Sequence, residues 1–470
     1  MTNPGAPPSP IASTEAILYK SAAQHFLAGR FDQAEAQARF IVTNNRRHPE
    51  ALNLLGILAM QNLELDRAAA IFSDIILITP NSADAHCNLG IVKLRQQKYE
   101  EALTILGHAI SLNPSLVAAH ISHGDTLRAL KRLDESIAAF QKAIALKPEN
   151  PDAHYNLSMA LLARGDYPAG WHEHEWRWQT PRLQGSLPTS PKPLWRGEPA
   201  AGKTLLVLCE QGLGDTLQFC RYAPLAAAAG LRVIVATQAP LVRLLKTLPG
   251  VDQLISLGDR IPAFDLFCPM MSLPLALDTT LETVPANMPY LRADPQLQAH
   301  WQTRLGVRPD KVKRVGLIWA GNPRRDSQNK LLWLTDQRRS IDPIHLAPLF
   351  DLPNLEFYSL QKDGTPPPPE FKLIDFMPEM QDFADTAALI ANLDLVISVD
   401  TSSAHLAGAL NKPIWLLDRF DPCWRWLTGR VDSPWYPALH IYRQNNPGDW
   451  RGVISDVSRD LKIFSAQDQS

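Results

Sequence analysis

Two short stretches of the sequence combine glycine, hydroxyl and carboxylate residues in an order that suits chemistry at the start of a helix. The first, EQGLGDTLQF, follows the apolar run TLLVLC and ends its glycine turn at Asp215. A carboxylate held there can take the proton of an attacking hydroxyl group. It can equally cap the helix, because Asp is favoured at helix N-termini. Both interpretations of Asp215 stay open, and we expect the turn around it to be supported by Glu210, Gln211, Gly212 and Gly214.

The second stretch, SVDTSSAHL, offers hydroxyl groups and backbone N–H groups where a phosphate could bind. Asp400 ends an apolar run, and the residues after it open a helix whose N-terminus favours anions. Arg339 and Ser340, in the segment RRSID, could add a charge-assisted clamp on such an anion. The alternatives are a simple turn residue for Asp400 and a packed helix residue for His405. The candidate phosphate-binding residues are Asn322, Arg339, Ser340, Asp400, Thr401, Ser402, Ser403 and His405, and Gln361 is a candidate for the nucleotide pocket.

Alternating apolar strands and helices must position these residues. Strand, glycine turn and helix at TLLVLC–EQGLGD open a first doubly wound α/β lobe, predicted over residues 203–305. A second lobe, predicted over 306–462, begins with the strand RVGLIWAGNP, and a tail is predicted over 463–470. Because a carboxylate competes with phosphate, the Asp215 loop suits an acceptor and the Asp400 turn suits a phosphate-bearing donor.

One match to a phosphate-binding motif, the P-loop, lacks the structural context that the motif requires. Gly197 and the run Gly202-Lys203-Thr204 match the spacing of a P-loop. That chemistry needs a strand before the loop and a helix after it, whereas here a Pro-rich connector, residues 183–202, precedes and an apolar strand follows. We interpret the match as chance.

The N-terminal third repeats every 34 residues. Pro80, Pro114 and Pro148 share this period, and a small residue recurs in phase with them at Gly56, Gly90 and Gly124. The pattern resembles the tetratricopeptide repeat, in which a small residue lets two helices touch and a proline ends the second helix. The resemblance implies an α-helical solenoid of about five units over residues 15–182, after a disordered tail over 1–14.

The first helix of each unit lines the concave face of such a solenoid, where peptides can bind. Asn88, Ser122 and Asn156 occupy one repeat position on that face. Amide side chains offer a donor and an acceptor to a peptide backbone. The alternative is that they are ordinary solvated polar residues.

The C-terminal part resembles glycosyltransferase family 9, the heptosyltransferases. The resemblance covers roughly residues 203–462 and rests on the glycine turn ending at Asp215, on VGLIWAGNP, on SLQK and on the DTSSAH turn. Ser402 stands where the family often has glycine, and the insert RRDSQNKLLWLTDQRRS is a further departure. The resemblance implies a GT-B fold of two Rossmann-like lobes, with Asp215 as the catalytic base. The layout of repeats followed by GT-B is also similar to that of O-linked N-acetylglucosamine transferase.

Composition narrows the classes further. The 470 residues carry 46 Lys and Arg against 48 Asp and Glu, a formal net charge of −2, which argues against a protein that coats nucleic acid. Five scattered cysteines give neither a disulfide framework nor a zinc site and fit a reducing compartment. No secretory signal and no apolar stretch of membrane-spanning length are evident, so a cytoplasmic protein is expected.

The leading hypothesis is therefore a glycosyltransferase of hexosyl or heptosyl type. It would move a sugar from a nucleotide-sugar donor to an acceptor, a protein held by the repeats, without a metal or other cofactor. The alternative is an interaction scaffold whose GT-B domain no longer catalyses. A P-loop NTPase ranks last.

Overall fold

The computed structural model describes residues 10–187, 190, 192–322 and 330–467. By their contacts the residues form two compact units, one up to Leu157 and one from Ser158 onward. Most of the predicted tail over 1–14 lies outside the described residues, and the first helix, α1, already begins at Pro10.

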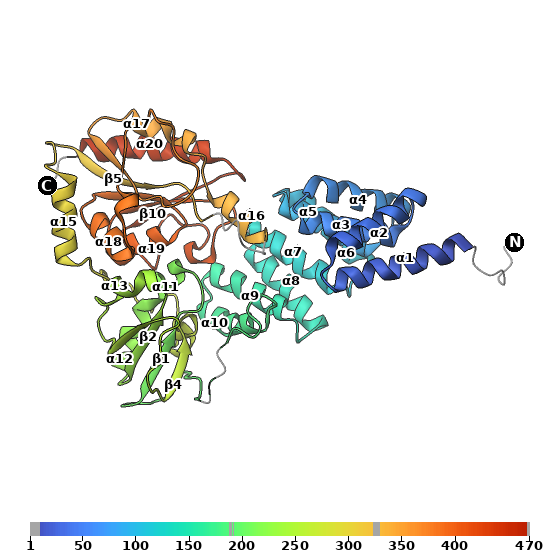
Figure 1. Cartoon of the computed structure of the whole chain (residues 1–470), viewed down its shortest axis with the longest axis horizontal. Helices are drawn as coiled ribbons and strands as arrows, with labels where there is room; N and C mark the ends of the chain where they lie inside the picture. The colour runs from blue at the N-terminus through green and yellow to red at the C-terminus, as the bar shows by residue number, and fades with distance from the viewer. Residues whose placement is uncertain (1–9, 188–189, 191, 323–329, 468–470) are drawn as a thin grey trace. The chain divides into compact units, whose positions relative to one another are not determined.

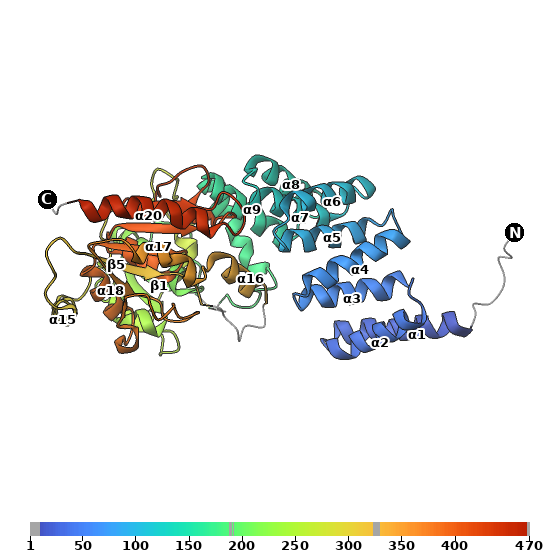
Figure 2. The ribbon, with the colours of Figure 1, turned by 90° about the horizontal axis from the view of Figure 1, so that it is seen from above.

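The first unit is a series of antiparallel helix pairs, which Figure 2 shows one after another along the chain. A small residue is required where paired helices touch, since a Cβ at Gly56 would lie 2.7 Å from the Phe72 ring and one at Gly124 would lie 2.7 Å from the Phe140 ring. The predicted helical solenoid is thus confirmed. Its helices are α1 (Pro10–Leu27), α2 (Phe31–Asn44), α3 (Pro49–Gln61), α4 (Leu65–Ile78), α5 (Ala83–Arg95), α6 (Tyr99–Leu112), α7 (Val117–Ala129), α8 (Leu133–Leu146) and α9 (Pro151–Arg164).

The last repeat helices belong to the second unit. The boundary between the units falls inside α9, and α10 (Tyr167–His174) and the 3-10 helix η1 (Glu175–Gln179) follow it. Tyr167 and Trp171 are almost fully buried, and the Trp171 indole N–H donates to the carbonyl oxygen of Thr279 at 3.2 Å. The indole N–H of Trp435 donates to the Tyr167 hydroxyl at 3.0 Å. The end of the predicted array is therefore packed into the α/β part of the chain.

The predicted connector over 183–202 also takes part in the fold. Leu194 forms a parallel bridge with Phe267, and the neighbouring Trp195 is 3% exposed and donates its N–H to the Phe267 carbonyl at 2.8 Å. The loop around Lys203 precedes strand β1 (Thr204–Leu208), which is the reverse of the order that a P-loop needs.

The first lobe holds a sheet of four parallel strands in the order β3-β2-β1-β4. Successive strands on one side of β1 alternate with short helices, and the order reverses between β1 and β4. Ligands of such sheets bind at the carboxyl ends of the strands at the reversal. The elements are β2 (Arg232–Thr237), β3 (Gln253–Ser256), β4 (Leu266–Pro269), α11 (Leu213–Phe219), α12 (Ala223–Ala228), α13 (Val242–Leu245) and α14 (Leu273–Ala276).

The second lobe holds six parallel strands in the order β10-β9-β8-β5-β6-β7, with the reversal between β5 and β8. Every residue of β5 is buried, and the hydrophobic core of the lobe includes Val315 and Leu317 of this strand and Ile397 of β8. Both lobes are therefore Rossmann-like. The strands are β5 (Lys313–Ile318), β6 (Leu355–Ser359), β7 (Leu373–Asp375), β8 (Leu395–Val399), β9 (Ile414–Asp418) and β10 (Leu439–Arg443); the helices are α16 (Lys330–Arg339), α17 (Ala347–Phe350), α18 (Phe383–Ala391), α19 (Ser402–Ala409) and α20 (Trp450–Ala466).

Two helices lie differently from the predicted boundaries. The helix α15 (Pro295–Leu305), expected to close the first lobe, packs on α18 of the second, as Figure 1 shows, and the Trp301 indole N–H donates to Asp385 Oδ1 at 3.4 Å. The reason is the large aromatic side chain of Trp301, which is only 2% exposed because α15 packs against α18. Helix α20 continues to Ala466, into the predicted tail over 463–470.

Candidate functional site

Asp215 lies in the first turn of α11, directly beyond the carboxyl end of β1. Its Oδ2 accepts the backbone N–H of Gly212 at 2.8 Å, and its Oδ1 accepts Nη2 of Arg425 at 2.5 Å. Gly212 has no side chain, so the turn holds only half of a capping box. The side chain is 24% exposed. Asp215 therefore does cap its helix, and it also reaches solvent, as a group that meets a substrate must.

Gly214 lies where the turns of the two lobes touch. A Cβ at this position would lie 3.1 Å from Cδ2 of His405 and 3.4 Å from Cα of Ser402. Helices α11 and α19 pack against each other accordingly. The two stretches that the sequence predicts as acceptor and donor loops are thus brought together, with the Asp215 carboxylate on one and the N-terminus of helix α19 on the other.

The turn after β8 has the backbone geometry of a helix start. Thr401 is extended, with φ −138° and ψ 171°, and its Oγ1 lies 3.1 Å from the Ser398 hydroxyl. Ser402 and Ser403 form the first turn of α19 and are half-buried. Their N–H groups and hydroxyls are the groups of this turn best suited to a phosphate.

His405 is buried in the same helix. Its Nδ1 lies 2.9 Å from the Tyr436 hydroxyl, its Nε2 lies 4.0 Å from Asp400 Oδ1, and its ring stacks on Trp426 with centroids 5.3 Å apart. Burial, and then the charge of Arg425, lower the pKa of His405 to about 3. The imidazole is therefore neutral at physiological pH, and its packing matches that of a core histidine.

Arg339 joins the loops that follow the two strands at the reversal. Its Nη1 donates to the carbonyl oxygen of Asp400 at 3.0 Å, and its Nε donates to Oδ1 of the buried Asp336 at 3.0 Å. Gly321 leaves room for this pair, since a Cβ there would lie 2.1 Å from Asp336 Oδ1. The Ser340 hydroxyl accepts the N–H of Gly321 at 3.1 Å. Arg339 thus holds the Asp400 turn in place through a hydrogen bond, and its positive charge is balanced by Asp336.

Asn322 and Gln361 follow the neighbouring strands. Asn322 is exposed, at the edge of the described residues, and residues 323–329 of the predicted insert lie outside them. The Gln361 side chain accepts the N–H groups of Trp319 and Ala320, at 3.0 and 2.9 Å, and donates to the carbonyl oxygens of Ala320 and Asp363. All four of its hydrogen bonds are therefore made to backbone, which leaves none for a nucleotide.

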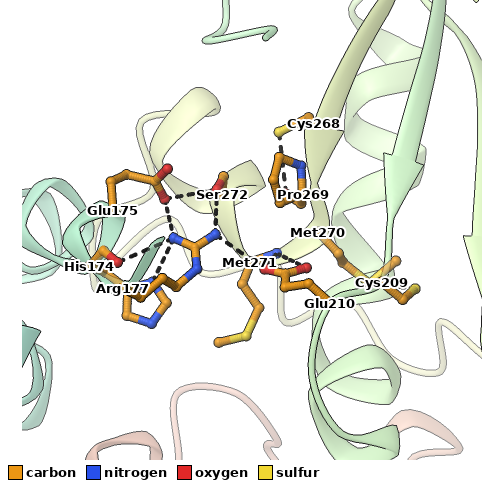
Figure 3. Close-up of polar contacts among 10 residues, drawn as sticks. All are labelled: His174, Glu175, Arg177, Cys209, Glu210, Cys268, Pro269, Met270, Met271 and Ser272. Atoms are coloured by element: carbon orange, nitrogen blue, oxygen red, sulfur yellow. Dashed lines mark hydrogen bonds and ion pairs between the residues drawn. The ribbon is translucent and has the colours of Figure 1, made fainter. Parts of the chain in front are cut away.

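Glu210, at the start of the turn that leads to Asp215, is held in place by Arg177 (Figure 3). Arg177 Nη2 donates to Glu210 Oε1 at 3.2 Å and to the Ser272 hydroxyl at 2.6 Å, and its Nη1 pairs closely with Glu175. Glu210 also accepts the N–H of Met271, at the carboxyl end of β4, at 3.2 Å. Burial raises the pKa of Glu210 to about 7 although Arg177 opposes the shift. Further along the turn, the Gln211 carbonyl accepts Nε2 of Gln238 at 2.9 Å.

Arg177 and Arg425 are absent from the residues predicted by sequence. Each is flanked by tryptophans, at 176–178 and 424–426, so the tripeptide WRW occurs twice. Each is buried and pairs with a carboxylate of the same turn, Arg177 with Glu210 and Arg425 with Asp215. The WRW pattern was the signal by which sequence reasoning could have found these two arginines, because a guanidinium group stacks on neighbouring tryptophan rings.

The asparagines predicted to bind a peptide are hydrogen-bonded to polar side chains on the first helix of the preceding repeat. Asn88 Nδ2 donates to Asn53 Oδ1 at 3.0 Å, and Asn156 Nδ2 donates to Asp125 Oδ2 at 3.2 Å. Burial raises the pKa of Asp125, against the opposing charge of Arg128. Ser122 is only 8% exposed, so it offers little to a peptide.

Comparison with known protein families matches the two parts of the chain separately. Models of the tetratricopeptide repeat match residues 25–86, 83–116 and 124–165. The model of glycosyltransferase family 9 (heptosyltransferase) matches residues 369–416, which contain β7, β8, α19 and the Asp400 turn. The N-terminal part is therefore a tetratricopeptide-repeat solenoid, and the part that follows is similar to glycosyltransferase family 9 over the matched residues.

One relative matches over a longer stretch. Protein FlbA of Caulobacter vibrioides is 28% identical over 340 residues, which is 65% of this chain and 54% of FlbA. The chain thus spans about half the length of the curated relative it matches.

Two solved structures are each similar to about a third of this chain. A MamA fragment from Desulfovibrio magneticus RS-1 is 24% identical, with a TM-score of 0.31 over 37% of this chain and 98% of its own. The tetratricopeptide-repeat protein TTC0263 of Thermus thermophilus is 21% identical, with a TM-score of 0.34 over 37% of this chain and 94% of its own. Within the described ranges, no helix is long and apolar enough to cross a membrane.

Proposed function

We propose that the chain is a glycosyltransferase of the GT-B type that moves a sugar from a nucleotide-sugar donor to a protein acceptor. The observation that carries the proposal is the contact between the two turns at Gly214 and Ser402. It sets a solvent-reaching carboxylate beside a helix N-terminus, each at the strand-order reversal of its own parallel sheet. The family 9 match over the Asp400 turn supports the same interpretation.

In this proposal the donor's diphosphate binds at the start of α19. Its oxygens receive the backbone N–H groups of that turn and the hydroxyls of Thr401, Ser402 and Ser403, where the helix dipole adds a favourable charge. Asp215 takes the proton from the attacking acceptor hydroxyl. Because the helix N-terminus supplies a favourable charge here, we propose that no metal ion is required. The repeats hold the protein acceptor, and the paired amides Asn88 and Asn156 contact its backbone.

A donor panel tests the proposal. The purified full chain is incubated with UDP-, GDP-, ADP-, CDP- and dTDP-sugars, with and without a chelator, and products are followed by mass spectrometry. Release of a nucleoside diphosphate from one donor, unaffected by the chelator, is the expected result. Mass gain on a co-purified or added protein identifies the acceptor class.

The alternative is a scaffold whose α/β domain does not catalyse. One observation favours this alternative: both carboxylate oxygens of Asp215 already accept hydrogen bonds, from Gly212 and Arg425. Calorimetry separates the two functions: absence of binding across the whole panel supports the scaffold and contradicts the transferase.

A further inference from the structure

An arginine that the proposed reaction does not yet use lies against its base. Arg425 comes from the 3-10 helix η7 (Trp424–Trp426), in the loop between β9 and β10 of the second lobe. Its Nη2 lies 2.5 Å from Oδ1 of Asp215, which belongs to the first lobe. Removing the Asp215 carboxylate would leave Arg425 as a buried cation without a counter-charge.

The pocket around Arg425 holds the guanidinium firmly and leaves part of it free. The residue is 9% exposed, its guanidinium carbon lies 4.5 Å from the Trp424 ring centre, and its Nε donates to Gln218 Oε1 at 2.5 Å. Its Nη1 donates to Cys423 Sγ at 3.4 Å. Among the described residues, three of its five N–H groups therefore have partners, and two remain for an anion.

The phosphate-binding turn is close enough to share this cation. Gly214, next to Asp215, touches Ser402 and His405 of α19. Burial lowers the pKa of Arg425, but Asp215, and more weakly Asp400 at the end of β8, raise it above its ordinary value. The carboxylates of both turns therefore act on one guanidinium.

We propose that Arg425 is a further catalytic residue, which pairs with Asp215 before transfer and with the leaving diphosphate during it. This inference rests on the proposed function. The acceptor oxygen forms a bond to the anomeric carbon, and its proton passes to the Asp215 carboxylate. The bond from that carbon to the diphosphate oxygen breaks, and its electron pair leaves with the diphosphate. One negative charge thus disappears at Asp215 as one appears on the diphosphate, and Arg425 keeps a counter-charge throughout.

Binding of nucleoside diphosphates, without any sugar, tests this arrangement. Calorimetry on the full chain compares the wild type with Asp215→Asn, Arg425→Met, Arg425→Lys and the double variant Asp215→Asn/Arg425→Met, using UDP, GDP, ADP, CDP and dTDP. Asp215→Asn should tighten binding about threefold or more, because the diphosphate no longer competes for Arg425. Arg425→Met should weaken it about tenfold or more, and Arg425→Lys less. In the double variant the gain from Asp215→Asn should vanish.

A matched ion pair in the same loop provides the control. Arg430 pairs with Asp432 at 2.5 Å, away from the turn, so Arg430→Met and Asp432→Asn should leave nucleotide affinity unchanged. If Asp215→Asn tightens binding equally without Arg425, or if Arg425→Met binds like the wild type, the inference is wrong while the proposed function stands. Should Arg425→Met not fold, unchanged affinity in Asp215→Asn alone would overturn it. If the wild type binds none of the nucleotides, the proposed function fails and the inference with it.

Discussion

Arg177 donates to Glu210 across 3.2 Å, joining the segment that ends the repeats to the first residues beyond β1. The arginine side chain is fully buried, and it also pairs with Glu175. The turn that carries Asp215 is therefore held at its start by Arg177 and at its end by Arg425.

Arg177→Met should lower the free energy of unfolding of the α/β unit by about 3–5 kcal/mol, because it leaves the buried Glu210 carboxylate without its cation. Denaturant unfolding followed by tryptophan fluorescence measures the change. Arg182 is exposed a few residues later, and Arg182→Met should change stability by no more than about 0.5 kcal/mol. Equal losses in the two variants would contradict the role given to Arg177.

The pH dependence of stability should carry a contribution from Glu210. Its pKa is raised by burial from 4.5 to about 7, so the folded chain binds this proton more tightly than the unfolded chain. Stability therefore falls as the pH rises from about 4.5 to 7 and stays at the lower level above that range. Glu210→Gln removes this contribution. The stability of the wild type relative to Glu210→Gln should fall by about 1–3 kcal/mol between pH 4.5 and pH 8. Urea unfolding at both pH values checks the sign, and a rise instead of a fall would refute it.

Asp215→Asn should lower the turnover number of the transferase by a factor of about 10²–10⁴. The amide oxygen can still accept the Gly212 N–H, so the helix start should persist. Initial rates with the donor found in the panel give kcat and KM separately. Asp259 accepts the N–H of Ser256 at 2.9 Å elsewhere in the first lobe, and Asp259→Asn should leave both constants unchanged. Full activity in Asp215→Asn would exclude it as the base.

Gly214→Ala should push the two turns apart, because its Cβ comes within 3.1 Å of the buried His405 ring. We expect a destabilisation of about 1–3 kcal/mol together with weaker nucleotide binding. Gly107, in helix α6, has open space around it, and Gly107→Ala should instead stabilise its own unit by about 0.5–1 kcal/mol. Thermal unfolding followed by circular dichroism, combined with nucleotide titration, distinguishes the two outcomes.

A fragment that begins at Pro151 should fold, whereas one that begins at Lys203 should not. The shorter fragment lacks Tyr167 and Trp171, which are almost fully buried, and exposes the aromatic surface that they cover. Solubility after expression and the cooperativity of thermal unfolding compare the fragments. Cooperative unfolding of the shorter fragment would show that the α/β part does not need the end of the repeats.

The repeats and the buried strands could be predicted from sequence because their signals are local and periodic. The 34-residue recurrence of Gly56, Gly90 and Gly124 reflects a contact with a large side chain of the following helix, sixteen residues later in each case, at Phe72, Leu106 and Phe140. Apolar runs bounded by glycine and proline likewise marked the buried strands β1 and β8.

The side-chain partners at the site could not be predicted, because they are distant in sequence. Arg425 is 210 residues from Asp215, and no local pattern specifies that pair. Gln361 was predicted for the nucleotide pocket, but its side chain is hydrogen-bonded to the backbone groups of Trp319 and Ala320, just beyond the end of β5. The placement of α15 failed for the same reason, since Trp301 is covered by a helix more than eighty residues later.

The position of the unit boundary inside α9 makes the length of the solenoid adjustable. A 34-residue repeat could be inserted or removed before Pro151 without touching Tyr167, Trp171 or Arg177, which secure the turn of Asp215. A change in the number of repeats would therefore alter the surface of the solenoid while leaving the contacts around Asp215 in place.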